Sequence, residues 1–137
     1  MQIAVAIDGS DNALRAAKYA VSFAKHMPLS TLDVIFVADY NKATKDRLLA
    51  QSPESVALTR KQKIDPVLEL AKEAHLETKT TILKGNPSEE IIRYVNEGKI
   101  DHLVLGSRGL NVFQEMILGS VSHKVMKHVS CPVTIIK

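Results

Sequence analysis

Cysteine, aromatic residues and long apolar runs are scarce in this chain of 137 residues. It has one cysteine, no tryptophan and an aromatic content of only 4%. A single cysteine excludes an internal disulfide and fits the reducing cytoplasm, which is where we expect the protein to act. No apolar run approaches the ~20 residues that a membrane-spanning helix needs. Asp8 also interrupts the apolar N-terminal stretch, so we expect neither a membrane partner nor a signal peptide.

Charge of one sign does not dominate either. Lysine and arginine number 18 against 15 acidic residues, which gives a formal net charge of +3, and residues 60–63 form the one short basic cluster. Aromatic residues do not alternate with basic ones, so the stacking platform of a nucleic-acid binder is not evident and we expect no nucleic-acid partner. With 45% apolar and 24% charged residues, we expect residues 1–137 to form one folded domain.

Several catalytic signatures are missing as well. There is no P-loop with its lysine, no G-x-G-x-x-G after the first strand, and no G-x-S-x-G nucleophile elbow. The five histidines lack metal-ligand spacing, since even His123 and His128 would lie about 140° apart around a helix. Cys131, just before Pro132, is interpreted as a small packing residue. The sequence therefore predicts no catalytic residue.

What the chain does contain is a regular alternation of apolar strands and amphipathic helices. Strands are expected at residues 2–8, 32–38, 76–83, 101–105 and 132–136, and helices after Ser10, across residues 53–75, over 87–96 and over 119–128. Pro66 predicts either a kink in the second helix or a fresh start capped by Asp65. The polar residues 39–52 predict a flexible connection. Strands that alternate with helices pair in parallel, so we expect a single-domain three-layer α/β sandwich with a five-stranded parallel sheet.

The most informative motif follows the fourth expected strand. Gly106, Gly109, Gly119 and Ser120, here called the glycine motif, have the spacing Gly-x2-Gly-x9-Gly-Ser. Glycines let the backbone leave a strand and approach a ligand closely. The second Gly-Ser pair stands where a helix begins, with free N–H groups and the positive end of the helix dipole. This combination suits an anion, and above all a phosphate chain.

With this motif the chain resembles the universal stress protein family, and specifically its ATP-binding branch. Residues 3–10, 85–92 and 131–136 resemble the family's first strand and acidic turn, its third strand-to-helix junction and its closing strand. The resemblance implies a Rossmann-like fold of the adenine nucleotide alpha hydrolase-like type, with strand order 3-2-1-4-5. In that order the first and fourth strands are neighbours, and their carboxyl ends flank the switch point where ligands bind.

The resemblance also implies a ligand, ATP with Mg²⁺ or Mn²⁺, and a set of contacts. Asp8 is a polar contact to the nucleotide or to a metal bound with its phosphates, and the backbone of Val37 recognises the adenine edge. The full set of expected nucleotide-binding residues is Ala6, Ile7, Asp8, Val37, Gly106, Ser107, Arg108, Gly109, Leu110, Asn111, Val112, Gly119, Ser120 and Val121. It further implies a homodimer that pairs through the C-terminal strand.

Three functions remain open on the sequence. The first is an ATP-binding regulatory module in the stress response, in which occupancy alters a dimer or partner surface. The second is a slow ATPase or autophosphorylating enzyme that uses the same site, although no base and no phosphate-clamping lysine is evident. The third is an interaction module that binds no nucleotide, and the intact glycine motif argues against it.

Overall fold

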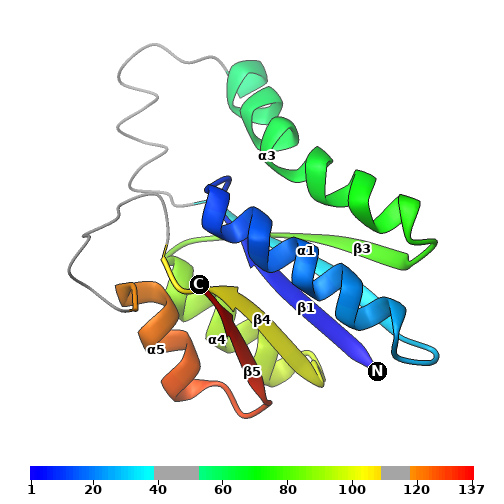
Figure 1. Cartoon of the computed structure of the whole chain (residues 1–137). Helices are drawn as coiled ribbons and strands as arrows, with labels where there is room; N and C mark the ends of the chain where they lie inside the picture. The colour runs from blue at the N-terminus through cyan, green and yellow to red at the C-terminus, as the bar shows by residue number, and fades with distance from the viewer. Residues whose placement is uncertain (39–52, 109–117) are drawn as a thin grey trace.

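The computed structural model describes residues 1–38, 53–108 and 118–137 (Figure 1). Along the chain the elements are β1 (Gln2–Ile7), α1 (Asp11–Lys25), β2 (Thr31–Ala38), α3 (Pro53–Glu73), β3 (Glu77–Lys84), α4 (Pro87–Glu97), β4 (His102–Gly106), α5 (Ser120–His128) and β5 (Val133–Ile136). The expected alternation of strands and helices is confirmed. The connection expected at residues 39–52 lies outside the described residues.

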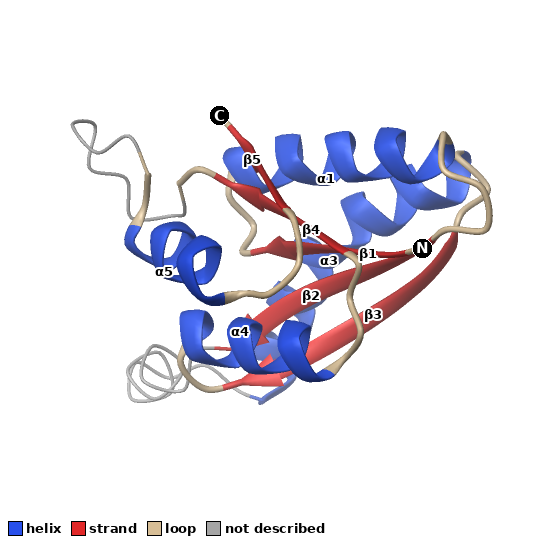
Figure 2. Ribbon diagram, turned by 90° about the horizontal axis from the view of Figure 1, so that it is seen from below, coloured by secondary structure: helices blue, strands red, loops and turns tan. Residues whose placement is uncertain are grey.

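The five strands form one parallel sheet in the order β3-β2-β1-β4-β5, which confirms the expected order. Figure 2 shows α1 and α3 on one face of this sheet and α4 and α5 on the other. Each central strand therefore buries side chains on both faces of the sheet. Ile3 and Val5 of β1 pack toward α1 and α3, whereas Ala4 packs with Ile91 and Val125 of α4 and α5. The three-layer α/β sandwich follows.

Two helices begin with side-chain caps. The Ser10 hydroxyl accepts a hydrogen bond from the Ala13 N–H at the start of α1 (3.1 Å), and the Asn86 side chain accepts one from the Glu89 N–H at the start of α4 (3.2 Å). Each cap satisfies a backbone donor that has no partner inside its helix. The caps thus fix where the chain turns from strand to helix.

Pro66 does not divide the helix that contains it. The helix α3 runs without interruption from Pro53 to Glu73, so a fresh start capped by Asp65 is wrong. Pro66 is exposed, while its neighbours Ile64 and Val67 are buried against the sheet. Packing of this apolar side holds the helix together across the missing hydrogen bond. Figure 1 shows the ribbon of α3 changing direction near its middle, as expected for a proline kink.

Among the helices of the described residues, none combines the length and apolarity that crossing a bilayer requires.

Candidate functional site

The residues predicted to bind a nucleotide gather at the carboxyl edge of the sheet, in so far as they are described. Ala6, Ile7 and Asp8 end β1, Val37 lies near the end of β2, Gly106 to Arg108 end β4, and Gly119 to Val121 begin α5. β1 pairs with β4 through Val5 and Val104 and with β2 on its other side, so the carboxyl end of β1 lies at the switch point of the sheet. Gly109, Leu110, Asn111 and Val112 lie outside the described residues.

The turn after β1 (the 8–10 turn) is stabilised by its own side chains. One oxygen of the Asp8 carboxylate accepts a hydrogen bond from the Ser10 N–H (2.9 Å), and the Ser10 hydroxyl caps α1. Gly9 between them has φ +88°, a left-handed conformation that favours glycine. Asp8 therefore shapes the turn, and whether it also contacts a ligand stays a prediction.

Val37 lies where β2 extends past β1. The last register pair of these two strands is Ile7 with Phe36, whereas β2 continues along β3 to Ala38. Val37 is half-buried and packs at the edge of the core below α4 and α5. Its backbone stands beyond the ladder with β1, which is compatible with the predicted contact to an adenine edge.

Gly106 is a glycine for a reason that the motif does not reveal. A Cβ at this position would overlap the side-chain oxygen of Asn12. Asn12 is buried at the start of α1, where its oxygen accepts from the Arg108 N–H (2.8 Å) and its amide donates to the Ile136 carbonyl (3.2 Å). This one side chain links α1, the end of β4 and the end of β5.

The sequence analysis did not predict a role for Asn12, although the spacing of residues in its helix indicates one. Asn12 precedes Ala16, Ala20 and Ala24 by helical spacing, and all four residues are buried. A polar residue in the apolar stripe of a helix needs hydrogen-bond partners in the core. Reading the stripe that way would have marked Asn12 as a residue that holds another element in place.

The two halves of the glycine motif are joined directly by hydrogen bonds. The Gly119 N–H donates to the Ser107 carbonyl (2.6 Å), and the Ser122 hydroxyl donates to the Gly106 carbonyl (2.6 Å). The Ser107 N–H in turn donates to Ile136 (2.7 Å). Because the Gly119 N–H is already engaged, the N–H groups of Ser120 and Val121 are the described donors at the start of α5 that are left to face a ligand.

The N-terminus of α5 differs from those of α1 and α4. The N-cap residue of α5 is Gly119, so no side chain caps this helix, and its first turn has no acidic residue. By contrast, side chains cap α1 and α4, whose first turns contain Asp11 and Glu89. Ser120 and Val121 are exposed. Within the described ranges, the positive end of the α5 dipole is thus left open at the switch point, which favours an external anion.

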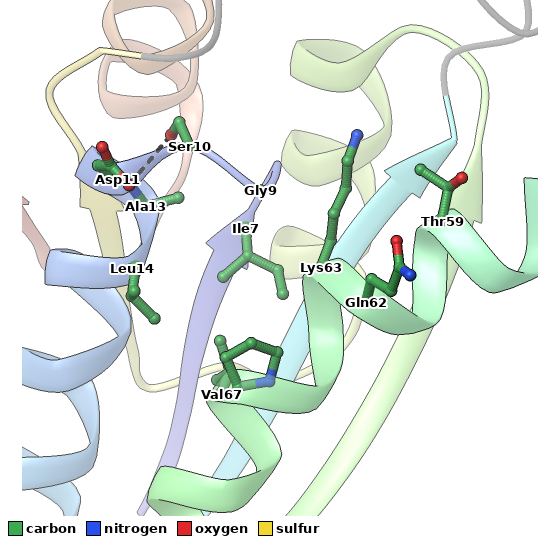
Figure 3. A pocket seen from close by; sticks show the side chains of 11 residues that line it. Ile7, Gly9, Ser10, Asp11, Ala13, Leu14, Thr59, Gln62, Lys63 and Val67 are labelled. Carbon is green, nitrogen blue, oxygen red and sulfur yellow. Dashed lines mark hydrogen bonds between the residues drawn. The ribbon is translucent and has the colours of Figure 1, made fainter.

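A second wall of this edge comes from α3. A cleft of about 200 Å³ lies between α1, α3 and the 8–10 turn (Figure 3). Its apolar floor includes Ile7 and Val67, and Lys63 rises along one side of it. No predicted motif covers α3, so its part in the site was not foreseen.

The described residues do not form a metal centre by themselves. No group of three or more histidine, cysteine, aspartate or glutamate side chains gathers in the parts of the chain that the structure describes. Asp8 offers one carboxylate, and one of its oxygens is already engaged by the 8–10 turn. A cation would therefore need further ligands, such as the phosphate oxygens of a nucleotide.

Burial is the main cause of the shifted pKa values of two titratable side chains elsewhere in the sheet region. Burial lowers the pKa of His102, whose Nε2 lies 2.7 Å from the Thr134 hydroxyl. Burial also raises the pKa of Cys131, which packs at the edge of the core. A thiol with a raised pKa is a poor nucleophile, which agrees with the interpretation of Cys131 as a packing residue.

Strand order and layer arrangement define a doubly wound α/β protein, a class in which ligands bind at the switch point of the sheet. The universal stress protein family model matches residues 1–137. The curated universal stress protein YxiE of Bacillus subtilis is 34% identical over 143 residues, covering 97% of this chain and 96% of its own. The chain belongs to the universal stress protein family.

Solved structures agree on the fold. Universal stress protein UspA from Lactobacillus plantarum has a TM-score of 0.82 at 26% identity, covering 100% of this chain and 97% of its own. The protein from Archaeoglobus fulgidus in complex with dAMP has a TM-score of 0.75 at 20% identity, with coverages of 100% and 98%. An Arabidopsis thaliana family protein with AMP bound has a TM-score of 0.71 at 22% identity, with coverages of 100% and 91%.

Proposed function

We propose that this protein binds ATP at the carboxyl edge of its sheet and acts as a nucleotide-dependent regulatory module of the stress response. The observation that carries the proposal is the open N-terminus of α5, with no side-chain cap and no acidic residue in its first turn. Phosphate oxygens would accept hydrogen bonds from the Ser120 and Val121 N–H groups and from the Ser120 hydroxyl. The adenine nucleotides in two structural relatives support this choice of ligand.

The rest of the edge suits the nucleoside end of the same ligand. Val37 offers backbone groups beyond the ladder with β1, and Ala6 adds apolar surface on the same face of the sheet. Ile7 lines the cleft on the other face. Phosphates at α5 and base near β2 would lay the nucleotide across the end of β1. Asp8 lies at that crossing and is the residue that would hold Mg²⁺ or Mn²⁺ together with the phosphates, and the cation would neutralise part of their charge.

Binding is the role that these residues favour over rapid turnover. They would hold and orient phosphates by backbone donors, but no described side chain at this edge is evidently poised to activate a water molecule. Positioned phosphates without an activated nucleophile leave most of the transition-state stabilisation missing. Occupancy of the site is then the signal, and the unpaired edge of β5 is the surface through which we expect two copies to pair.

The test uses a substitution that separates helix stability from phosphate binding. Ser120→Asp puts a carboxylate at the first position of α5, where the dipole favours it by about 0.3–1 kcal/mol. The same charge would repel a phosphate. We expect this variant to unfold no more readily than the wild type and to lose ATP affinity at least about tenfold.

Calorimetric titration with ATP, AMP, adenosine and GTP measures the effect, and Ser120→Asn is the matched control without charge. Adenosine affinity should change little in either variant, because adenosine has no phosphate. ATP binding to Ser120→Asp as tight as to the wild type would refute the role of α5. Failure of the wild-type protein to bind ATP at millimolar concentration with Mg²⁺ would refute the proposed function.

A further inference from the structure

Lys63 is held in one place by two contacts of its long side chain. Its stem lies directly on Gly9, where an added Cβ would stand 2.7 Å from Cγ and 2.8 Å from Cδ of the lysine. Its ammonium group lies 5.9 Å from the centroid of the Phe36 ring, within the range of a cation–π interaction. The missing side chain of Gly9 thus makes room for a lysine that reaches over from α3.

These contacts direct the ammonium group toward the edge where the nucleotide is proposed to bind. Figure 3 shows the Lys63 side chain extending from α3 past Gly9, in the direction in which β1 and β2 run. Phe36 immediately precedes Val37, and Gly9 belongs to the 8–10 turn. Lys63 therefore lies on the β1–β2 side of the site, whereas α5 begins on the β4 side.

The ammonium group has no carboxylate partner in the part of the chain that the structure describes. The ion pairs there involve Lys79, Arg93 and Lys124, and Asp11 lines the same cleft from the α1 side without pairing to Lys63. An ammonium group carries three donors and no acceptor. Held over the Phe36 ring, it can donate to an acceptor that a ligand brings to this edge.

We propose that Lys63 contacts the nucleoside part of the bound nucleotide and that α3 is thereby the second wall of the site, an inference that rests on the proposed function. The phosphate chain is proposed to lie on the far side of β1, at α5. The acceptors that reach Lys63 are then the ring nitrogens of the base or the hydroxyl oxygens of the ribose. Lys63 is a specificity-determining residue, since a ligand without such an acceptor leaves its ammonium group without a partner.

The experiment compares Lys63→Met with Lys61→Met, an exposed lysine two positions earlier on the same helix. Methionine keeps an unbranched stem over Gly9 and removes the charge and the donors. We expect Lys63→Met to weaken adenosine, AMP and ATP by the same factor, about tenfold, the usual effect of losing a hydrogen bond from a charged donor. Lys61→Met should bind all three ligands as the wild type does.

The pattern across the ligands decides the inference. A larger loss for ATP than for adenosine would put Lys63 on the phosphates, and unchanged affinities would remove it from the site; either result overturns the inference. Titration with 2′-deoxyadenosine adds detail, because disappearance of the Lys63 effect identifies the ribose hydroxyl and its persistence identifies another nucleoside acceptor.

The control outcomes separate this inference from the proposed function. If the wild type and Lys63→Met bind ATP equally well, only the role of Lys63 is refuted and the proposed function stands. Wild-type protein that binds none of the three ligands refutes the proposed function and this inference together. Circular dichroism on each sample verifies the fold, and Lys63→Gln repeats the test with a neutral donor should the methionine variant unfold.

Discussion

Asn12 is the residue on which the geometry of the glycine motif depends, and Asn12→Ala tests this. The substitution removes the acceptor for the Arg108 N–H and the donor to the Ile136 carbonyl. It also empties the space beside Gly106 that the asparagine side chain fills. We expect the end of β4 to lose its fixed position relative to α1.

The expected magnitude follows from what each partner has left. The Ile136 carbonyl keeps the hydrogen bond from the Ser107 N–H, so this loss costs only about 0.5–1.5 kcal/mol. The Arg108 N–H loses its acceptor in a partly buried position, which costs about 1–3 kcal/mol. Together the two losses lower the unfolding free energy by about 1.5–4.5 kcal/mol. At a typical slope of about 2 kcal/mol/M, the midpoint of urea unfolding should fall by about 0.8–2 M.

Urea unfolding and ATP titration on the same variant measure stability and site geometry separately. Asn96→Ala is the matched control, because Asn96 also accepts from a backbone N–H, that of Ser130 (2.9 Å), and donates to a backbone carbonyl, that of His128 (3.1 Å). Asn96 is exposed and lies at the end of α4, away from the glycine motif. We expect Asn12→Ala alone to lower ATP affinity, by about fivefold or more. Equal ATP affinities of the two variants would refute the reasoning and reduce Asn12 to a packing residue.

Three further predictions concern stability, assembly and chemistry. Tyr94→Phe should lower the unfolding free energy by about 1.5–3 kcal/mol in thermal or urea unfolding, because the Tyr94 hydroxyl donates to the buried Asp33 carboxylate (2.5 Å). Tyr19→Phe is the control and should change the unfolding free energy little, because the Tyr19 hydroxyl has no such bond among the described residues. Ile135→Lys should convert a dimer to a monomer in sedimentation at tens of micromolar protein, since it puts a charge on the edge strand β5; a dimer that persists would move the interface elsewhere. Phosphate release from ATP should stay well below the ~1 s⁻¹ of slow ordinary enzymes, and faster turnover that Asp8→Asn abolishes would make the protein an enzyme.

The sequence predicts the elements of this fold well because local signals mark them. Two helices begin where the pattern predicts, α1 directly after Ser10 and α4 at Pro87. The runs predicted as strands at 2–8 and 101–105 correspond to the strands β1 and β4. The strand order is different in kind, since periodicity carries no information on which strands are neighbours. The predicted strand order rested on the resemblance to the universal stress protein family alone. Pro66 shows the limit of a local rule, because burial of Ile64 and Val67 keeps α3 continuous across it.

The candidate site was predictable only where its residues form a sequence motif. The spacing of the glycine motif correctly indicated the end of β4 and the start of α5. It could not indicate that Gly106 makes room for Asn12, which is 94 positions earlier in the chain, or that Gly9 makes room for Lys63 of α3. Both are tertiary contacts, and nothing in the local pattern around either glycine specifies the side chain that will occupy its space.

The two helix N-termini at the switch point are not equivalent, and this difference orients the proposed ligand. In dinucleotide-binding folds the phosphates lie at the turn after the first strand. Here that turn is closed: Ser10 caps α1, Asp8 engages the Ser10 N–H, and Asp11 adds negative charge to the first turn of the helix. The N-terminus of α5 has neither cap nor acidic residue, so an anion is favoured there and disfavoured at α1. The nucleoside is then directed toward β2 and Lys63. If that orientation is right, Ser120→Asp and Lys63→Met act on opposite ends of one molecule: the first should weaken ATP and spare adenosine, and the second should weaken both equally.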